Sequence, residues 1–499
     1  MKTSDLIKKF PEEKDLVTHS RPYFNHSIEF KNIFTPRERA DMLDIAGLNM
    51  FFFPSEMITG CDLLSDSGTT SMTNEQWAAL HLRDEAYGSN RGYFLVMKQI
   101  IETFGEEFFN DPNSGRPNAF IFHQGRPAED ALFTMVGRLG SGLIIPGNGH
   151  FDTTQANIKR NNMQAVNLFS PELMDESSGY HFKGDMDLIK FKSLLERSHN
   201  KIPLSYLTIT NNTGGGQPVS MENIRDVSNV SNHYDIPLFF DACRFAENAW
   251  FIQQHEPGYG NKDIKTIVKE MFSYVDGFTI SFKKDGLVNM GGGLFLKDNG
   301  LFMKKYPDIP DAIMGHQIDK EGHPTYGGLS GRDIMTLAVG LKIATKEEYL
   351  TYRINQVKDF GENLKNHGLP VMAPIGGHAV YLDMNKFFAD TAIKPEDFGG
   401  VAFTAVLLAA YGHRTIELGN FSFGSYDKKT KKEILPEFNF VRFAIPRLRY
   451  EKKDLDSVAE AVKILYENRD KIPPVNVTYG RDLPMRHFKA RFEFRKYSI

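Results

Sequence analysis

The chain is poor in cysteine and contains no long apolar segment. Only two cysteines, Cys61 and Cys243, occur among its 499 residues. That is too few for a disulfide framework and is typical of a reducing compartment. No apolar run approaches the roughly 20 residues of a membrane span, and the stretch Met1–Lys9 lacks the apolar core of a signal peptide. The sequence therefore predicts a cytoplasmic protein without a membrane partner.

The chain also lacks a strong charge of either sign. Its formal net charge at pH 7 is −4, so the composition does not favour nucleic acid or an anionic membrane as a partner. Its hydrophobic fraction of 41% is ordinary for a globular protein. A chain of this length buries a large core, and we expect two domains.

Between about residue 75 and residue 330, helical patterns alternate with short β-rich runs. The runs include Leu204–Thr210, Ile236–Phe240 and Gly277–Ile280. Continuous apolar strands separated by helices favour a parallel sheet covered on both faces, and ligands bind beyond the carboxyl ends of such strands. Asn212, Asp241 and Lys284 each follow such a run. We therefore expect these three side chains to meet at one edge of the sheet.

An aspartate and a lysine at the ends of neighbouring strands suit pyridoxal phosphate (PLP). The lysine forms a Schiff base with this cofactor, and the aspartate pairs with the pyridinium nitrogen. Arg244, three residues after Asp241, could hold that carboxylate ionised. Two other interpretations stay open at this point, namely Asp241 as a helix N-cap and Arg244 in an ordinary surface ion pair. Spacing alone does not say whether Lys283 or Lys284 is the nucleophile.

A glycine turn with an arginine could bind the cofactor phosphate. In Gln124-Gly125-Arg126, the glycine permits close backbone approach, and an arginine followed by a helix N-terminus favours an anion. Any glycine turn with one arginine would match this pattern. Phe151 follows another glycine turn and could stack on a ring, although a core position is the commoner use of phenylalanine.

Taken together, several long motifs resemble the β-eliminating lyases, the family of tryptophanase and tyrosine phenol-lyase. The resemblance runs from about Phe52 to Phe488. The motifs are Asp66-Ser67-Gly68-Thr69, Asp84-Glu85-Ala86-Tyr87, His123-Gln124-Gly125-Arg126, Gly215-Gly216-Gln217-Pro218-Val219-Ser220, Arg244-Phe245-Ala246-Glu247-Asn248-Ala249, Lys283-Lys284-Asp285 and Tyr326-Gly327-Gly328-Leu329. A chance match to all of them in this order is not credible.

The resemblance implies an α/β enzyme of the PLP-dependent aspartate-aminotransferase fold (fold type I). This fold has a large domain with a mainly parallel sheet and a smaller α+β domain. We expect an N-terminal arm and part of the small domain at 1–70, the large PLP-binding domain at 71–330, and the small domain at 331–499, which would open with one long helix over 331–366. The resemblance further implies a potassium-activated homotetramer with active sites at a subunit interface.

Carried over by motif, the resemblance assigns a role to each candidate residue. The implied catalytic residues are Lys284 as the Schiff-base lysine, Tyr87 in proton transfer to the leaving group, Asp241 at the ring nitrogen and Arg244 at the ring oxygen. The other implied cofactor contacts are Asn212, Phe151, Gln124, Gly125, Arg126, Ser281 and Lys283, the last five at the phosphate. The implied substrate contacts are Phe52, Ser65, Asp152, Asn212, Leu418, Arg442 and His487, with Arg442 at the carboxylate. The implied potassium ligands are Gly68, Glu85 and Asn289.

Three positions favour tryptophan catabolism over the phenol-lyase reaction. Leu418 stands where phenol-lyases carry the arginine that recognises the phenol hydroxyl, and an apolar residue suits indole better. Asp152 and His487 both match the tryptophanase version of their motifs. Asp152 could accept the indole N–H, and His487 could line the pocket. We therefore expect elimination of indole from L-tryptophan, with pyruvate and ammonia as the other products.

Three departures from the family pattern keep other leaving groups open. His323 stands where the family has phenylalanine or methionine, Phe282 where it has alanine or glycine, and Leu287-Val288-Asn289 looks like the phenol-lyase version. The alternatives are a tyrosine phenol-lyase or a lyase for another β-substituted amino acid. An aminotransferase of the same fold is a further class, which would not release ammonia.

Overall fold

The computed structural model describes residues 21–24, 27–110, 115–175 and 177–495. Its α-helices are α2 (Pro36–Ile45), α3 (Asn74–His81), α4 (Arg91–Phe104), α5 (Gly125–Gly137), α6 (Asp152–Arg160), α7 (Pro171–Met174), α8 (Leu188–Ser198), α9 (Met221–His233), α10 (Phe245–His255), α11 (Ile264–Ser273), α12 (Leu301–Lys305), α13 (Ile309–Glu321), α14 (Gly331–Ala344), α15 (Glu347–Asn366), α16 (Met384–Phe387), α17 (Gly399–Tyr411) and α18 (Lys452–Glu467). Its strands are β1 (Ala119–Phe122), β2 (Ile144–Gly147), β3 (Gln164–Asn167), β4 (Ser205–Thr208), β5 (Leu238–Asp241), β6 (Gly277–Ser281), β7 (Gly292–Leu296), β8 (Ala379–Asp383), β9 (Ile416–Leu418), β10 (Ser425–Asp427), β11 (Lys432–Ile434), β12 (Phe440–Ala444), β13 (Val475–Tyr479) and β14 (Arg491–Phe494). Within these described ranges, no helix combines the length and apolarity needed to cross a bilayer.

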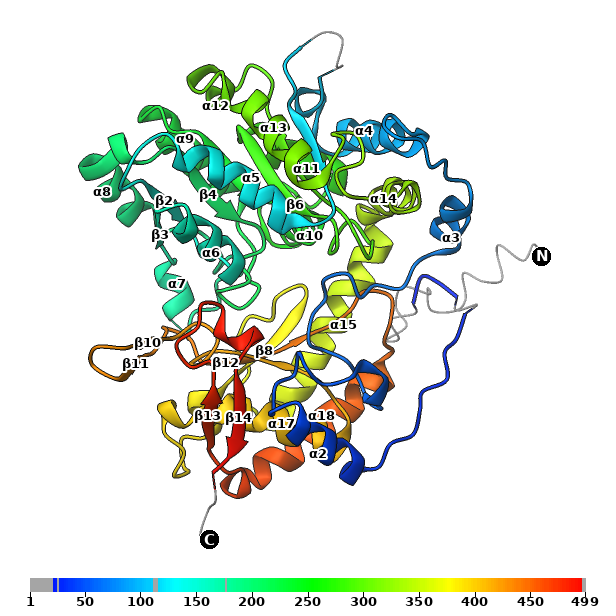
Figure 1. The fold of residues 1–499 in the computed structure, drawn as a ribbon, viewed down its shortest axis with the longest axis vertical. Coiled ribbons are helices and arrows are strands. Elements are labelled where there is room, and N and C mark those ends of the chain that lie inside the picture. Colours follow the sequence, from blue (N-terminus) through cyan, green and yellow to red (C-terminus); the bar gives the residue numbers. More distant parts are fainter. Residues whose placement is uncertain (1–20, 25–26, 111–114, 176, 496–499) are drawn as a thin grey trace, which may run out of the picture.

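The larger body, cyan to green in Figure 1, contains a seven-stranded sheet in the order β1-β7-β6-β5-β4-β2-β3. Strands β3, β2, β4, β5 and β6 run parallel, whereas β7 pairs antiparallel with both β6 and β1. Strands β4 to β7 are buried along their whole length, as is expected of a sheet covered on both faces. The prediction of a mainly parallel sheet is confirmed, and the ends of β4, β5 and β6 lie side by side.

The smaller body, yellow to red in Figure 1, contains the antiparallel sheet β8-β12-β9. Helices α15, α17 and α18 pack on or beside this sheet together with α2, which is blue in Figure 1. Leu43 and Leu63 share one apolar core with Phe403, Val441 and Val462. The segment that precedes the large domain therefore contributes to the core of the small one.

Two helices, not one, span residues 331–366, so the expected single helix is wrong. Helix α14 ends at its C-cap Thr345, and Lys346 is extended before α15 begins. The apolar face of α14 belongs to the large-body core, which continues to Ile354, whereas Val357 and Phe360 belong to the small-body core. The change of core falls within α15, later than the expected domain boundary after residue 330.

Candidate active site

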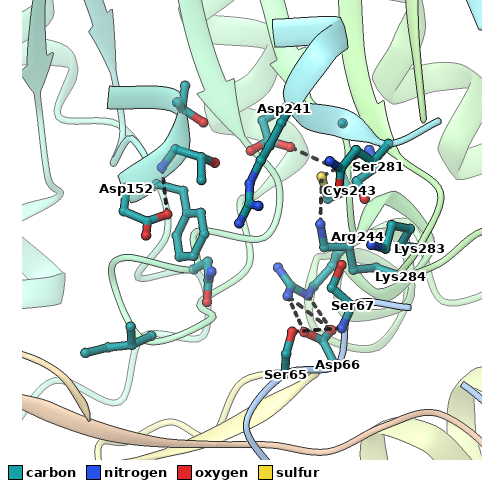
Figure 2. A pocket seen from close by; sticks show the side chains of 18 of the residues that line it. Ser65, Asp66, Ser67, Asp152, Asp241, Cys243, Arg244, Ser281, Lys283 and Lys284 are labelled. Carbon is teal, nitrogen blue, oxygen red and sulfur yellow. Dashed lines mark hydrogen bonds and ion pairs between the residues drawn. The ribbon is translucent and has the colours of Figure 1, made fainter. Parts of the chain in front are cut away.

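A cavity of about 250 Å³ lies at the carboxyl edge of the large sheet. Residues at or just beyond the ends of β4, β5 and β6 line it, together with the starts of α5 and α6, and the small body contributes residues of β9 and β12. Figure 2 shows how side chains from these separate segments point toward one space. Asn212, Asp241 and Lys284 all line this cavity, so their expected convergence is confirmed.

Most of the predicted site residues line this cavity. They are Ser65, Gln124, Gly125, Arg126, Phe151, Asp152, Asn212, Asp241, Arg244, Ser281, Lys283, Lys284, Leu418, Arg442 and His487. The residues that do not line it are Tyr87, Phe52, Gly68, Glu85 and Asn289.

The start of α5 is seated tightly against the end of β6 and the start of β7. A Cβ on Gly125 would lie 2.8 Å from the Cβ of Ser281, and a Cβ on Gly292 would lie 2.1 Å from the carbonyl of Gln124. Glycine is therefore needed at both positions for this approach. As a result, the free N–H groups and the positive dipole end of α5 face the cavity beside Ser281, an arrangement that binds anions.

Three cations surround this helix N-terminus. Arg126, Lys283 and Lys284 line the cavity, and among the described residues none of them pairs with a carboxylate. Burial, followed by the charges of Lys284 and Arg126, lowers the pKa of Lys283. A bound anion would offset the repulsion that the two neighbouring cations exert on Lys283. The site therefore fits the phosphate of PLP in its charge as well as in its backbone geometry.

Asp241 ends β5 and is 7% exposed. Its Oδ1 accepts a hydrogen bond from the backbone N–H of Cys243 at 3.4 Å. The next helix, α10, begins at Phe245 with Arg244 in the N-cap position, so Asp241 is not the N-cap of that helix. A buried carboxylate at this strand end fits a partner for a protonated ring nitrogen.

Arg244 pairs with Asp66, and the expectation that it holds Asp241 ionised is wrong. Its Nε and Nη2 donate to the Asp66 carboxylate at 3.2 and 2.8 Å, as Figure 2 shows. Both side chains are buried, so this is not an ordinary surface ion pair. Within the described residues no bond uses Nη1 of Arg244, which leaves that nitrogen as a donor for a ligand.

Asn212 is held by three donors on the small body. Its Oδ1 accepts hydrogen bonds from Tyr381 at 2.6 Å, from His378 Nε2 at 3.1 Å and from Arg442 Nη1 at 3.3 Å. Burial lowers the pKa of His378 well below its ordinary value, so this ring is neutral; because an amide oxygen only accepts, the contact with Asn212 assigns the proton to Nε2. Because the amide oxygen is occupied, the amide nitrogen of Asn212 is the group that remains for a ligand.

One part of the cavity lining is apolar and another part is polar. Ile416 and Leu418 of β9 form apolar lining. The polar part is formed by His487 and Asp152. Nε2 of His487 lies 3.0 Å from Oδ2 of Asp152, and both side chains are nearly buried. The Nδ1 of His487 has no hydrogen-bond partner among the described residues. An aromatic group with one polar atom fits such a lining.

Phe51, not Phe52, lines the cavity from the N-terminal segment. Phe51 packs against Phe488 with ring centroids 4.5 Å apart. Phe52 is 45% exposed and lies under the guanidinium of Arg491. In a run of three phenylalanines in a loop, no periodicity indicates which ring faces inward.

Tyr87 lies on the surface, 82% exposed, and contacts the rings of His323 and Tyr326. Within one chain it does not line the cavity. His323 also donates to or accepts from Thr325 Oγ1 at 2.8 Å. Phe282 is fully buried in the large-body core, so it does not narrow the cavity.

The predicted potassium ligands are not gathered by one chain. Asn289 Nδ2 donates to the carbonyl oxygen of Gly68 at 3.0 Å, whereas Glu85 accepts from the backbone N–H of Gly331. Within the described residues, no group of three or more His, Cys, Asp or Glu side chains is arranged to hold a metal ion. Potassium stays a prediction.

Sequence reasoning gave no role to several residues that line the cavity. They include Phe51, Asp66, Glu129, Thr154, Cys243, Ile416 and Phe488. Glu129 accepts hydrogen bonds from Thr154 and Asn157, and burial together with the charge of Asp241 raises its pKa to about 8. Its position four residues after Gly125, one turn along α5, is the only sequence signal that could have indicated it.

A lysine and an aspartate at neighbouring strand ends, beside an anion site at a helix N-terminus, define a fold type I PLP enzyme. Two solved structures share the fold. They are the aromatic aminotransferase of Pyrococcus horikoshii, with a TM-score of 0.55 and 12% identity over 86% of this chain and 99% of that one, and the threonine aldolase of Leishmania major, with a TM-score of 0.52 and 14% identity over 81% and 99%.

The chain belongs to the β-eliminating lyase family, whose model matches residues 62–461. It is 38% identical to the tyrosine phenol-lyase of Fusobacterium nucleatum over 96% of this chain and 98% of that protein. It is also 38% identical to the tryptophanase of Rhodobacter capsulatus over 95% and 98%, and 37% identical to a probable β-eliminating lyase of Trichomonas vaginalis over 92% and 95%. The chain is therefore a PLP-dependent lyase. Equal identity to both named activities does not separate their substrates.

Proposed function

We propose that this chain converts L-tryptophan to indole, pyruvate and ammonia. The observation that carries the proposal is the lining of the cavity, in which the apolar Leu418 occurs together with the Asp152–His487 pair. An indole needs an apolar surface for its ring and one acceptor for its N–H. Asp152 can supply this acceptor because a carboxylate has lone pairs beyond the one that faces His487.

The residues of this chain would hold PLP at four points: the phosphate, the ring nitrogen, the ring oxygen and the ring face. The N-terminus of α5 with Arg126, Ser281 and Lys283 would bind the phosphate. Asp241 would pair with the ring nitrogen, and Arg244 Nη1 with the Asn212 amide nitrogen would donate to the ring oxygen. When bound, PLP supplies an electron sink for the bonds broken at the substrate α-carbon. Phe151 would pack on the ring face.

The substrate would be oriented by Arg442 and deprotonated by Lys284. Arg442 lies in β12 at the cavity and contacts Asn212; its planar guanidinium suits a carboxylate. Lys284 Nζ lies 3.9 Å from Cys243 Sγ and has no carboxylate partner among the described residues. In its free form this amine would take the α-proton of the substrate.

The leaving indole must receive a proton at its ring carbon, because a carbanionic aryl group does not leave. We propose Tyr87 as this donor. Its 82% exposure in one chain supports a role in a cavity shared with a second copy, as expected of a homotetramer with sites at a subunit interface. Potassium activation and a cytoplasmic location belong to the same proposal.

The test is product analysis with purified protein, PLP and potassium. Tryptophan, tyrosine, serine and S-methyl cysteine are supplied separately, and indole, phenol, pyruvate and ammonia are measured. We expect indole and pyruvate in equal amounts from tryptophan. Pyruvate from another amino acid without indole from tryptophan would overturn the proposal in favour of the lyase for that substrate.

A phenol-lyase is the second candidate, favoured by the polar Asp152–His487 edge, which could also bind a phenol hydroxyl. Phenol release from tyrosine at a higher kcat/KM than indole release from tryptophan would identify it. An aminotransferase would give a keto acid without ammonia, so the ammonia measurement separates that class.

A further inference from the structure

Six buried charged side chains form one connected network that reaches from the cavity lining into the contact between the two bodies. They are Asp66, Arg244, Glu247, Asp285, Arg353 and Arg447, each at most 4% exposed. Three carboxylates and three guanidinium groups make the network formally neutral, as buried charges require. Its members come from five segments of the chain, since Arg244 and Glu247 both belong to the start of α10, and of the six only Asp66 and Arg244 line the cavity.

Arg447 lies at the centre of this network. Its Nη1 donates to Asp66 Oδ2 at 3.0 Å, and its Nη2 donates to Glu247 Oε1 at 2.6 Å and to Asp285 Oδ1 at 2.9 Å. It is fully buried and stands three residues after β12. A single guanidinium on the small body thus binds three carboxylates, of which Glu247 and Asp285 belong to the large body.

Through Asp66, Arg447 reaches the arginine that faces the ligand. Asp66 uses both oxygens to hold Nε and Nη2 of Arg244, and Arg447 binds the same Oδ2. The plane of the Arg244 guanidinium is therefore fixed, with Nη1 left for the cavity. Without Arg447, Asp66 would lose one of the contacts that set the orientation of its carboxylate.

Through Asp285, Arg447 reaches the lysine. Asp285 is the residue next to Lys284, and its Oδ2 accepts the backbone N–H groups of Ala246 and Glu247 at 2.8 and 3.0 Å. Arg447 holds the other oxygen. The backbone that carries Lys284 is thereby fixed to the start of α10 on one side and to the small body on the other.

We propose that Arg447 is a positioning residue that sets the orientation of Arg244 through Asp66 and of Lys284 through Asp285. The inference rests on the proposed function, because those two residues are its proposed cofactor contacts. It adds a link between β12, which carries Arg442, and the lysine-bearing loop. Only arginine can serve, since its planar fork spans several carboxylates whereas a lysine presents one point charge.

Arg447→Lys tests the proposal, with Arg353→Lys as the matched control. Arg353 is also a buried arginine, and its Nε binds the same Glu247 Oε1 at 3.2 Å, but it contacts neither Asp66 nor Asp285 among the described bonds. A purely structural role predicts equal effects of the two substitutions. A positioning role predicts that only Arg447→Lys strongly affects the cavity.

Four quantities are measured for each variant: Tm, the dissociation constant of PLP for the apoenzyme by visible absorbance, and kcat and KM for pyruvate release. We expect both variants to lose Tm similarly. Arg447→Lys should bind PLP about tenfold more weakly or worse and lose about tenfold or more in kcat, because small misplacements of reacting groups cost this much. Arg353→Lys should change the dissociation constant of PLP and kcat by less than about threefold.

A double substitution tests whether Arg447 acts through Arg244. In an Arg244→Gln background, Arg447→Lys should weaken PLP binding clearly less than it does in the wild type, because the path through Asp66 to Arg244 is already lost and only the path through Asp285 to Lys284 remains. An undiminished further loss there, or equal losses in Arg447→Lys and Arg353→Lys, would overturn the proposal. PLP binding needs no substrate, so this result stands apart from whether tryptophan is the substrate.

If Arg447→Lys does not fold, Asp66→Asn decides. It removes the charge that orients Arg244 and keeps the shape of the side chain. A loss of PLP affinity of about tenfold in folded Asp66→Asn supports the proposal, and unchanged affinity contradicts it.

Discussion

The carboxylate of Asp152 lies 3.0 Å from the imidazole Nε2 of His487. Asp152 opens α6 on the large body, and His487 follows β13 near the end of the chain. The pair joins the two bodies in the lining of the cavity, where it could contact the side chain of an aromatic substrate. It also gives the cavity a hydrogen-bond acceptor, the Asp152 carboxylate, whose position is fixed by the contact with His487.

The first prediction concerns this pair. Asp152→Ala should lower kcat/KM for tryptophan by about tenfold to a hundredfold, because a buried donor of the substrate is left unpaired at about 1–3 kcal/mol. His487→Phe should produce part of the same loss. In the double variant the losses should be less than additive. Independent, additive losses, or a larger loss for S-methyl cysteine than for tryptophan, would contradict recognition of the indole N–H by the pair.

The second prediction separates the two lysines. Lys284→Ala should abolish covalent tagging of the protein by borohydride in the presence of PLP, and nearly all turnover. Lys283→Ala should keep the tag but weaken PLP binding, because it removes one of three cations around the anion site. Peptide mapping of the tagged protein identifies the lysine directly. A tag on Lys283 would reverse the assignment.

The convergence of Asn212, Asp241 and Lys284 could be predicted from the sequence for a topological reason. In a parallel sheet the carboxyl ends of neighbouring strands meet at one edge. Three apolar runs followed by polar residues therefore determine a site before any side chain is placed. The motif around Gly125 could also be assigned to the cofactor phosphate. Its glycine allows the close approach of α5 to the end of β6 that the structure has.

The partners of charged residues could not be predicted in the same way. Arg244 pairs with Asp66, which lies 178 positions away in sequence, and not with the nearby Asp241. That choice depends on how the small body closes on the large one, which no local pattern encodes. The break between α14 and α15 is similar, since Thr345 and Lys346 are neither glycine nor proline and the apolar spacing continues across them.

The third prediction concerns the exposed Tyr87. If it acts in a cavity of a second copy, Tyr87→Phe and Lys284→Ala should each be nearly inactive, and a refolded equal mixture should regain activity. Random pairing across a two-fold interface gives hybrids with one complete site, so about a quarter of wild-type activity is expected. Mixing the two variants without unfolding, where subunits do not exchange, is the control. Absence of recovery after refolding would place Tyr87 in a different role.

The fourth prediction concerns stability at acid pH. Burial lowers the pKa of His150 from an ordinary 6.5 to about 4; the ring stacks on Tyr206 and its Nδ1 contacts Asn167 Oδ1. Between these two pH values the unfolded chain binds a proton at His150 and the folded chain does not. Folding therefore weakens as pH falls from 6.5 to 4, by about 3 kcal/mol from this group at about 1.36 kcal/mol per pH unit.

His150→Asn should remove this contribution, so the free energy of unfolding should fall less steeply between pH 6.5 and 4 than in the wild type. The measurement is urea unfolding at a series of pH values, with fluorescence as the signal and PLP held constant. The matched control is His81→Asn, because His81 is exposed near the end of α3 and is hydrated in both states. An unchanged pH slope in His150→Asn would mean that the imidazole is protonated in the folded protein, contrary to its burial beside Tyr206.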